Sequence, residues 1–160
     1  MATIVVRPGR PSDVPFVLQC IRELAEFEKL EHLFAGTVGQ LQDHLFGPSP
    51  SCELLIAERG DLACGYALYF TTYSTFLTRP GLFLEDLFVQ PNARGAGLGR
   101  ALLVELAKVA VSRGCGRLEW SVLDWNSRAI AFYDSLGATP VPGWIPYRLD
   151  GEALKVLARR

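Results

Sequence analysis

The sequence lacks features that would mark it as a nucleic-acid-binding or membrane protein. Its 16 Lys and Arg residues are balanced by 17 Asp and Glu residues, which leaves a formal net charge of -1 and no positive field for polyanions. No apolar run approaches the roughly 18 residues of a membrane span, and only four consecutive residues before Arg7 suit the apolar part of a signal peptide. We therefore expect a soluble, cytoplasmic protein whose partners include neither nucleic acid nor a membrane.

Metal-ligand patterns are also scarce. The four cysteines, Cys20, Cys52, Cys64 and Cys115, form no C-x-x-C pair, and only two histidines are present to join them. We interpret the cysteines as reduced thiols and expect no metal site. The 160 residues are 49% hydrophobic and contain no repeat, linker or low-complexity segment. We therefore expect a single globular domain over residues 1–160.

The spacing of apolar residues predicts both helices and strands. The predicted helices span residues 12–30, 38–46, 97–114, 126–137 and 151–160. The predicted strands span residues 3–8, 81–91, 116–125 and 143–150, and residues 52–73 form a hairpin with a tight turn at 59–61. Strands and helices alternate in the second half of the chain but not in its middle. We therefore expect an α/β fold with a mixed, mostly antiparallel sheet and helices on both faces.

Three glycines occupy alternate positions between the predicted strand 81–91 and the helix that follows it. Gly95, Gly97 and Gly99 permit positive φ and close backbone approach, and the start of the helix points amide N–H groups and the positive end of its dipole outward. Neither G-x-x-x-x-G-K-[ST] nor a complete G-x-G-x-x-G occurs here. The turn suits a phosphate or pyrophosphate, and a flexible loop that merely begins a helix is the alternative.

The glycine turn resembles the R/Q-x-x-G-x-G/A signature of the GNAT superfamily of N-acetyltransferases, in which it cradles the pyrophosphate of acetyl-coenzyme A (acetyl-CoA). The matching residues are Arg94, Gly95, Ala96, Gly97, Leu98 and Gly99. The order of the predicted elements is also that of the GNAT fold. The segments "RELAEFEKLE", "YFTTYSTF", "LEDLFV", "RGAGLGRALL", "WNSRAIAFY" and "GW" followed by "RLD" are similar to the diamine (spermidine/spermine) N-acetyltransferases and their thialysine-acetylating relatives. This resemblance implies acetyl-CoA as cosubstrate, a small-molecule amine as acceptor, and a homodimer.

The resemblance also assigns residues to the coenzyme. They are Leu87, Phe88, Val89, Arg94, Gly95, Ala96, Gly97, Leu98, Gly99, Arg100, Asn126, Ser127 and Tyr133. Tyr133 would protonate the departing thiolate, because a phenol with an ordinary pKa of about 10 keeps its proton at neutral pH. Asn126 lies seven residues earlier, on the same side of the predicted helix and ~10 Å away, and would bind the pantetheine arm. Simple packing of a half-buried ring is the alternative for Tyr133.

Glu85 and Asp86 are adjacent carboxylates inside the apolar run 82–89. Burying them is costly unless each has a partner or a bulge opens the sheet and frees backbone groups for the coenzyme. By resemblance, Glu85 would bind the substrate ammonium and help to remove its proton, and an ordinary ion pair with an arginine is its alternative. Asp86 would shape the bulge or the amine site, or it would serve structure alone.

The resemblance places Phe27 and Glu28 along the amine channel, where Trp144 could add a cation–aromatic contact. Two departures from the family's pattern bear on which amine is the acceptor. Phe27 stands where a tyrosine is common, and the segment 137–144 lacks the acidic residues of the polyamine acetylases. The acceptor is thus open among a polyamine, thialysine, another lysine-like amino acid, an aminoglycoside and a protein amine.

The mechanism predicted from the sequence is direct attack of the amine on acetyl-CoA in a ternary complex. No residue is arranged as an acyl-carrying nucleophile, since Cys115 has no histidine near it in the sequence. Two non-catalytic alternatives remain, a coenzyme-A-binding module and a protein that binds phosphate through the glycine turn alone.

Overall fold

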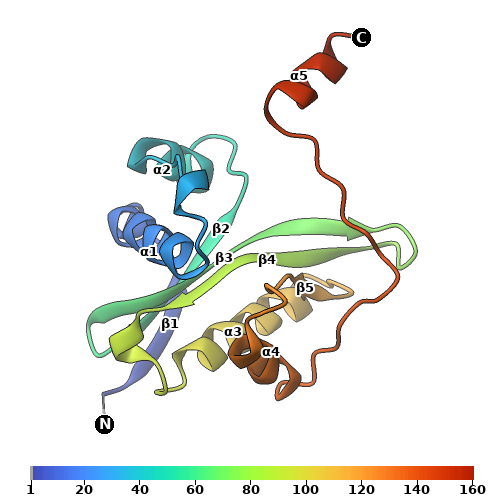
Figure 1. Cartoon of the computed structure of the whole chain (residues 1–160). Coiled ribbons are helices and arrows are strands. Elements are labelled where there is room, and N and C mark those ends of the chain that lie inside the picture. Colours follow the sequence, from blue (N-terminus) through green and yellow to red (C-terminus); the bar gives the residue numbers. More distant parts are fainter. Residues whose placement is uncertain (1) are drawn as a thin grey trace. The chain divides into compact units, whose positions relative to one another are not determined.

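The computed structural model describes residues 2–160, which divide into two compact units (Figure 1). The first unit ends at Ser121, and the second comprises Val122–Arg160. The expectation of one domain over the whole chain stays a prediction. Within the described residues, no helix has the length and apolar character needed to cross a membrane.

The first unit contains a five-stranded sheet whose order follows the sequence. Its strands are β1 (Ile4–Pro8), β2 (Glu53–Arg59), β3 (Leu62–Ser74), β4 (Arg79–Val89) and β5 (Leu118–Trp120). Neighbouring strands pair antiparallel as far as β4, and β4 and β5 pair parallel. The prediction of a mixed, mostly antiparallel sheet is therefore confirmed.

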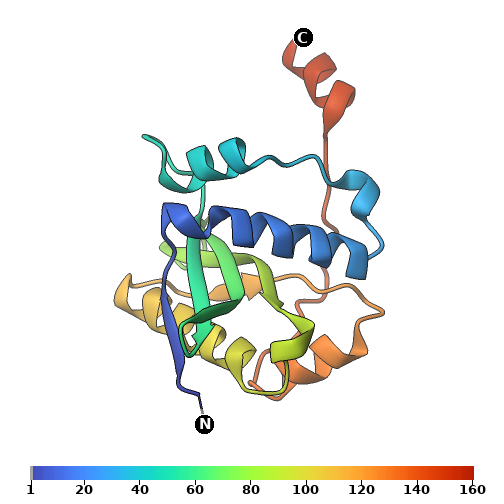
Figure 2. The same cartoon turned by 90° about the vertical axis from the view of Figure 1, so that its left-hand side faces the viewer.

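Helices cover both faces of this sheet, as predicted (Figure 1, Figure 2). Helices α1 (Val14–Phe27) and α2 (Val38–Phe46) lie on one face and α3 (Leu98–Ser112) on the other. Short 3-10 turns named η1 (Pro11–Asp13), η2 (Glu31–Leu33) and η3 (Pro91–Ala93) connect the elements. The core beneath α1 consists of Val14, Val17, Cys20, Leu45, Leu54, Ile56, Tyr66, Leu68 and Phe88. This core fixes the face of β3 and β4 on which the end of α1 lies.

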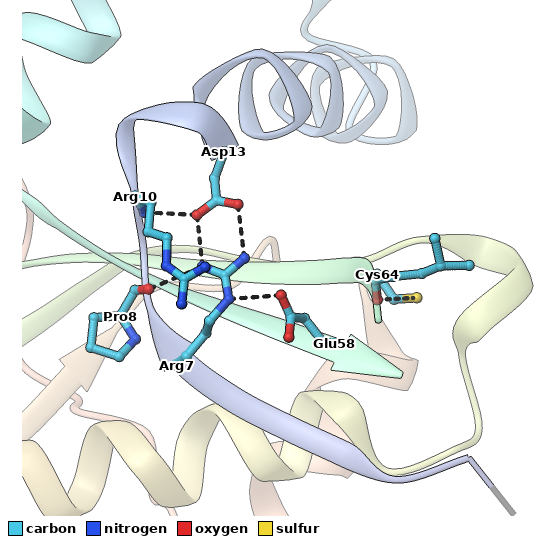
Figure 3. A network of polar contacts seen from close by, with 7 residues as sticks. Arg7, Pro8, Arg10, Asp13, Glu58 and Cys64 are labelled. Carbon is cyan, nitrogen blue, oxygen red and sulfur yellow. Dashed lines mark hydrogen bonds and ion pairs between the residues drawn. The ribbon is translucent and has the colours of Figure 1, made fainter. Parts of the chain in front are cut away.

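An arginine on β1 ties the start of α1 to the sheet (Figure 3). The Arg7 guanidinium donates two hydrogen bonds to Asp13, at 2.8 Å and 2.9 Å, and its Nε donates to Glu58 Oε1 on β2 at 2.7 Å. The backbone N–H of Arg10 also donates to Asp13, at 2.7 Å. The hydrogen bonds to Asp13, of which those from Arg7 have the largest effect, hold the pKa of its carboxyl below the usual range.

The second unit contains α4 (Ser127–Asp134) and α5 (Gly151–Ala158). Helix α4 begins as the sequence predicts, because the Asn126 side chain accepts a hydrogen bond from the backbone N–H of Ala129 at 3.2 Å. The strand predicted over residues 143–150, all of which are described, does not form. A strand needs a neighbour with which to pair, and no pairing partner for this segment is found among residues 2–160.

Candidate active site

The adjacent carboxylates lie at a β-bulge in β4. On β3, Leu68 pairs with Asp86 and the next residue, Tyr69, pairs with Leu84, so Glu85 has no counterpart. Directly paired residues share a face of the sheet, and Leu68 belongs to the core beneath α1. The bulge therefore turns Asp86 toward α1 and leaves Glu85 exposed. Of the two alternatives that the sequence left open, a partner for each acid or a bulge, the structure has a bulge at this point.

Asp86 has a buried partner that the sequence analysis missed. The hydroxyl of Tyr66 on β3 donates to Asp86 Oδ2 at 3.0 Å, and Tyr66 has no solvent exposure at all. Burial raises the pKa of Asp86, the Tyr66 bond lowers it, and the nearby Glu85 charge raises it. A signal for Tyr66 was present, since a tyrosine within an apolar strand needs a partner for its hydroxyl.

A third carboxylate joins this region from the end of α1. Glu28 is the C-cap residue of α1, and burial together with the Asp86 charge raises the pKa of its carboxyl. The structure thus brings Glu28 and Asp86 together from elements far apart in the sequence. We call Glu28, Glu85 and Asp86 the acidic cluster. Carboxylates in such a partly buried group favour a cationic ligand.

The sheet opens beside the acidic cluster. The pairing of β4 with β5 ends at Leu84 and Trp120, whereas the pairing of β4 with β3 continues to Val89 and Gly65. In the described ladder, residues 86–89 therefore pair on one side only. Strands that separate in this way leave backbone N–H and C=O groups available to a ligand. The contact of Leu87 with a coenzyme arm stays a prediction.

The glycine turn forms the opposite end of the candidate site. Gly95 has a φ of 82°, and Gly97, the N-cap residue of α3, has a φ of 89°. A Cβ at Gly95 would meet nothing within 4 Å, and one at Gly97 would meet only Ile4 Cδ1, at 4.0 Å. The first N–H groups of α3 have no acceptor within the helix, so the open turn fits a pyrophosphate. Gly99 differs from the other two because it lies inside α3.

Arg94 is held tightly at the start of this turn. Its Nε donates to the Val89 carbonyl at 2.9 Å, and its Cζ lies 5.7 Å from the ring centroid of Phe27 and 5.6 Å from that of Phe88. Phe27, which we expected along the amine channel, thus packs against an arginine predicted to face the coenzyme. The Phe88 ring is buried in the core, so its predicted coenzyme contact would involve the main chain.

The remaining predicted residues of the turn differ in their exposure. Leu98 is buried and anchors the first turn of α3, whereas Ala96 and Arg100 are exposed beside it.

Among residues 2–160, no three His, Cys, Asp or Glu side chains are grouped so that they could hold a metal ion.

Four other predicted site residues belong to the second unit. Tyr133 is half-buried on α4, with its ring centroid 5.5 Å from that of Phe132. The side-chain oxygen of Asn126 caps α4, and Ser127 is the first residue of that helix. Trp144 is 76% exposed in the irregular segment before α5. Their roles toward the coenzyme and the amine stay predictions.

Comparison with known proteins gives consistent matches along the chain. The model of the acetyltransferase (GNAT) family matches residues 19–138. A thialysine N-epsilon-acetyltransferase of Mus musculus is 40% identical over 171 residues, covering all of both chains. An L-ornithine N5-acetyltransferase of Arabidopsis thaliana is 32% identical over 95% of this chain and 86% of its own length. The solved structure of an integron cassette protein from V. cholerae superposes with a TM-score of 0.82 at 26% identity, covering 100% and 99% of the two chains.

Proposed function

We propose that this chain, which belongs to the acetyltransferase (GNAT) family and is an acetyl-CoA-dependent N-acetyltransferase, acetylates the side-chain amine of a lysine-like amino acid. The acidic cluster is the observation that carries this proposal, because it suits an acceptor with two cationic groups. The relatives named for thialysine and L-ornithine act on amino acids with a terminal side-chain amine. The absence of acidic residues from segment 137–144 favours such an amino acid over a polyamine.

Acetyl-CoA supplies the activated acetyl group as a thioester. The open glycine turn fits its pyrophosphate, which the backbone N–H groups near Gly97 and the first turn of α3 would bind. Arg94 would add its positive charge, held in place by Val89 and the two phenylalanine rings. The unpaired side of β4 would align the pantetheine arm through the main chain of Leu87 and Val89.

The acceptor amine arrives as an ammonium ion and must lose a proton before it attacks. Glu85, exposed by the bulge, would bind the ammonium and pass its proton to water. Glu28 and Asp86 would hold the second cationic group of the substrate. Phe27 would line the same end.

Direct attack within a ternary complex agrees with the environments of Cys20 and Cys52. Burial raises the pKa of the Cys20 thiol to about 12, and burial followed by the Glu53 charge raises the pKa of Cys52. Raised thiol pKa values disfavour the thiolate that a covalent mechanism requires. Tyr133 would then donate the proton that the departing thiolate takes up.

The acceptor is tested with a panel of amines and a readout of free coenzyme A. L-Lysine, L-ornithine and thialysine are compared with cadaverine, spermidine and an aminoglycoside. Cadaverine is the matched control, because it has the same terminal amine as L-lysine but no α-carboxylate. We expect kcat/KM to be at least about tenfold higher for a lysine-like amino acid, a difference of about 1.4 kcal/mol in transition-state binding.

Two outcomes would contradict the proposal. A higher kcat/KM for spermidine than for every amino acid would assign the enzyme to polyamines. Coenzyme binding without turnover of any amine would favour the non-catalytic module.

We also propose that the enzyme is a cytoplasmic homodimer. The family resemblance supports the dimer, and so do exposed apolar side chains such as Leu154 and Leu157 on α5, which a second copy would cover. Sedimentation equilibrium measures the mass in solution, and a monomer at micromolar concentration would contradict the dimer. Cell fractionation tests the location, which rests on the sequence alone.

A further inference from the structure

We propose that Tyr66 is a positioning residue that keeps the Asp86 carboxylate ionised and fixed at the amine end of the active site. Tyr66 acts through Asp86 and does not itself touch the substrate. This inference rests on the proposed function for the part that Asp86 plays toward the acceptor. The contact between Tyr66 and Asp86 is independent of that function.

Packing in the core fixes the Tyr66 ring and so the position of its hydroxyl. Tyr66 pairs with Phe88 across the two strands, and their ring centroids are 6.4 Å apart. Its ring belongs to the core beneath α1 together with Val14 and Val17. From this fixed ring the hydroxyl reaches Asp86 Oδ2 at 3.0 Å, so the carboxylate is held by a rigid donor.

The β-bulge explains why Asp86 needs this donor. Without the bulge, Glu85 would lie opposite Leu68 and face the core; with it, Asp86 takes that position. A carboxylate turned toward an apolar core tends to take up a proton unless a donor stabilises its charge. A protonated Asp86 would no longer attract the cationic group of an acceptor.

Apart from the Tyr66 hydrogen bond, the surroundings of the Asp86 carboxyl raise its pKa. Burial and the Glu85 charge raise the pKa of Asp86, whereas the Tyr66 hydrogen bond lowers it. From α1 and its C-cap, Cys20 and Glu28 raise the pKa of Tyr66, and neither of them is a cation. The Tyr66 hydroxyl is thus the group assigned to keeping Asp86 ionised.

A double-mutant cycle tests this inference on the intact enzyme. Tyr66→Phe, Asp86→Asn and the double variant are compared for the KM of the amine, the KM of acetyl-CoA and kcat across pH. We expect Tyr66→Phe to raise the amine KM about tenfold, the value of a hydrogen bond to a charged group, with little change in the other two constants. The increase should grow as pH falls, because the variant protonates Asp86 at higher pH.

The cycle separates positioning from a general loss of structure. In the Asp86→Asn background, Tyr66→Phe should leave the amine KM unchanged, whereas a merely structural role would give additive effects. Tyr69→Phe is the matched control, because Tyr69 is also buried on β3 but its hydroxyl contacts Glu53 at 3.5 Å. Its amine KM should equal that of the wild type.

A measurement without substrate distinguishes failure of this inference from failure of the proposed function. NMR titration of the Asp86 carboxyl carbon reports its pKa directly, and Tyr66→Phe should raise that pKa. If the wild type acetylates no amine, the proposed function has failed and the titration alone decides. An unchanged Asp86 titration, or additive effects on the amine KM, would overturn the role of Tyr66.

Discussion

Neighbouring residues in β4 meet opposite environments although a single peptide bond separates them. The bulge leaves Glu85 exposed, while Asp86 lies against the buried Tyr66 hydroxyl. The same chemical group can therefore serve two purposes. Exposure suits a carboxylate that exchanges protons with water, and a fixed donor suits one that keeps its charge.

At the level of single residues, Tyr133→Phe tests the acid that we assign to the departing thiolate. Loss of the hydroxyl should lower kcat by about 100-fold, within the usual range for a general acid. The Kd of acetyl-CoA should hardly change, because the ring is retained. Coenzyme A release gives kcat, and isothermal titration calorimetry gives Kd.

Tyr147→Phe is the control for this prediction, since Tyr147 is 93% exposed in the same unit. It should retain the wild-type kcat. Equal rates in all three proteins would refute the acid role of Tyr133.

At the level of elements, the glycine turn joins β4 to α3 and is the part of the site to which we assign the pyrophosphate. Gly97→Ala should raise the Kd of acetyl-CoA about tenfold. A side chain at a φ of 89° is strained by about 1–2 kcal/mol, and its methyl group would project into the open turn. Fluorescence or calorimetric titration with acetyl-CoA measures this Kd.

Gly60→Ala is matched to this change, because Gly60 also has positive φ, 66°, and open space at its Cβ. It lies between β2 and β3, so it should cost similar stability and leave the Kd unchanged. If both variants weakened acetyl-CoA equally, the glycine turn would have no special part in binding.

At the level of the whole molecule, the ion pair between Arg7 and Asp13 should contribute to global stability. Asp13→Asn should lower the free energy of unfolding by about 2 kcal/mol at neutral pH, because it breaks a largely buried, charge-assisted pair. The folded-state pKa of Asp13 is lowered, so this contribution is complete above the ordinary carboxyl pKa of about 4 and disappears as pH falls through the folded value.

Urea unfolding at several pH values measures the difference between the two proteins. Glu105→Gln is the control, since its pair with Lys108 is exposed and should contribute about 0–0.5 kcal/mol. An equal loss in both variants, or a difference for Asp13→Asn that persists in acid, would contradict the prediction.

Much of the fold could be predicted from the sequence because its signals are local. Helix α2 spans the predicted residues, Val38–Phe46, since its apolar spacing and flanking turn residues lie within a dozen positions. Segment 143–150 was predicted wrongly because its composition suits a strand, but pairing depends on a neighbour that composition does not reveal.

The candidate site could likewise be predicted only in part from the sequence. The glycine turn and the two acids of β4 could be identified as short motifs. The contact of Tyr66 with Asp86 and that of Phe27 with Arg94 depend on strand register and on where α1 ends. These long-range properties are settled only when the sheet and its core are assembled.

The bulge in β4 also shows which residue the sheet could do without. Leu84 with Tyr69 and Asp86 with Leu68 are consecutive pairs, and deletion of residue 85 would leave both intact. Counted by strand pairing, Glu85 is a one-residue insertion in an otherwise continuous hairpin. A single added codon therefore suffices to give such a hairpin an exposed carboxylate beside a half-buried one.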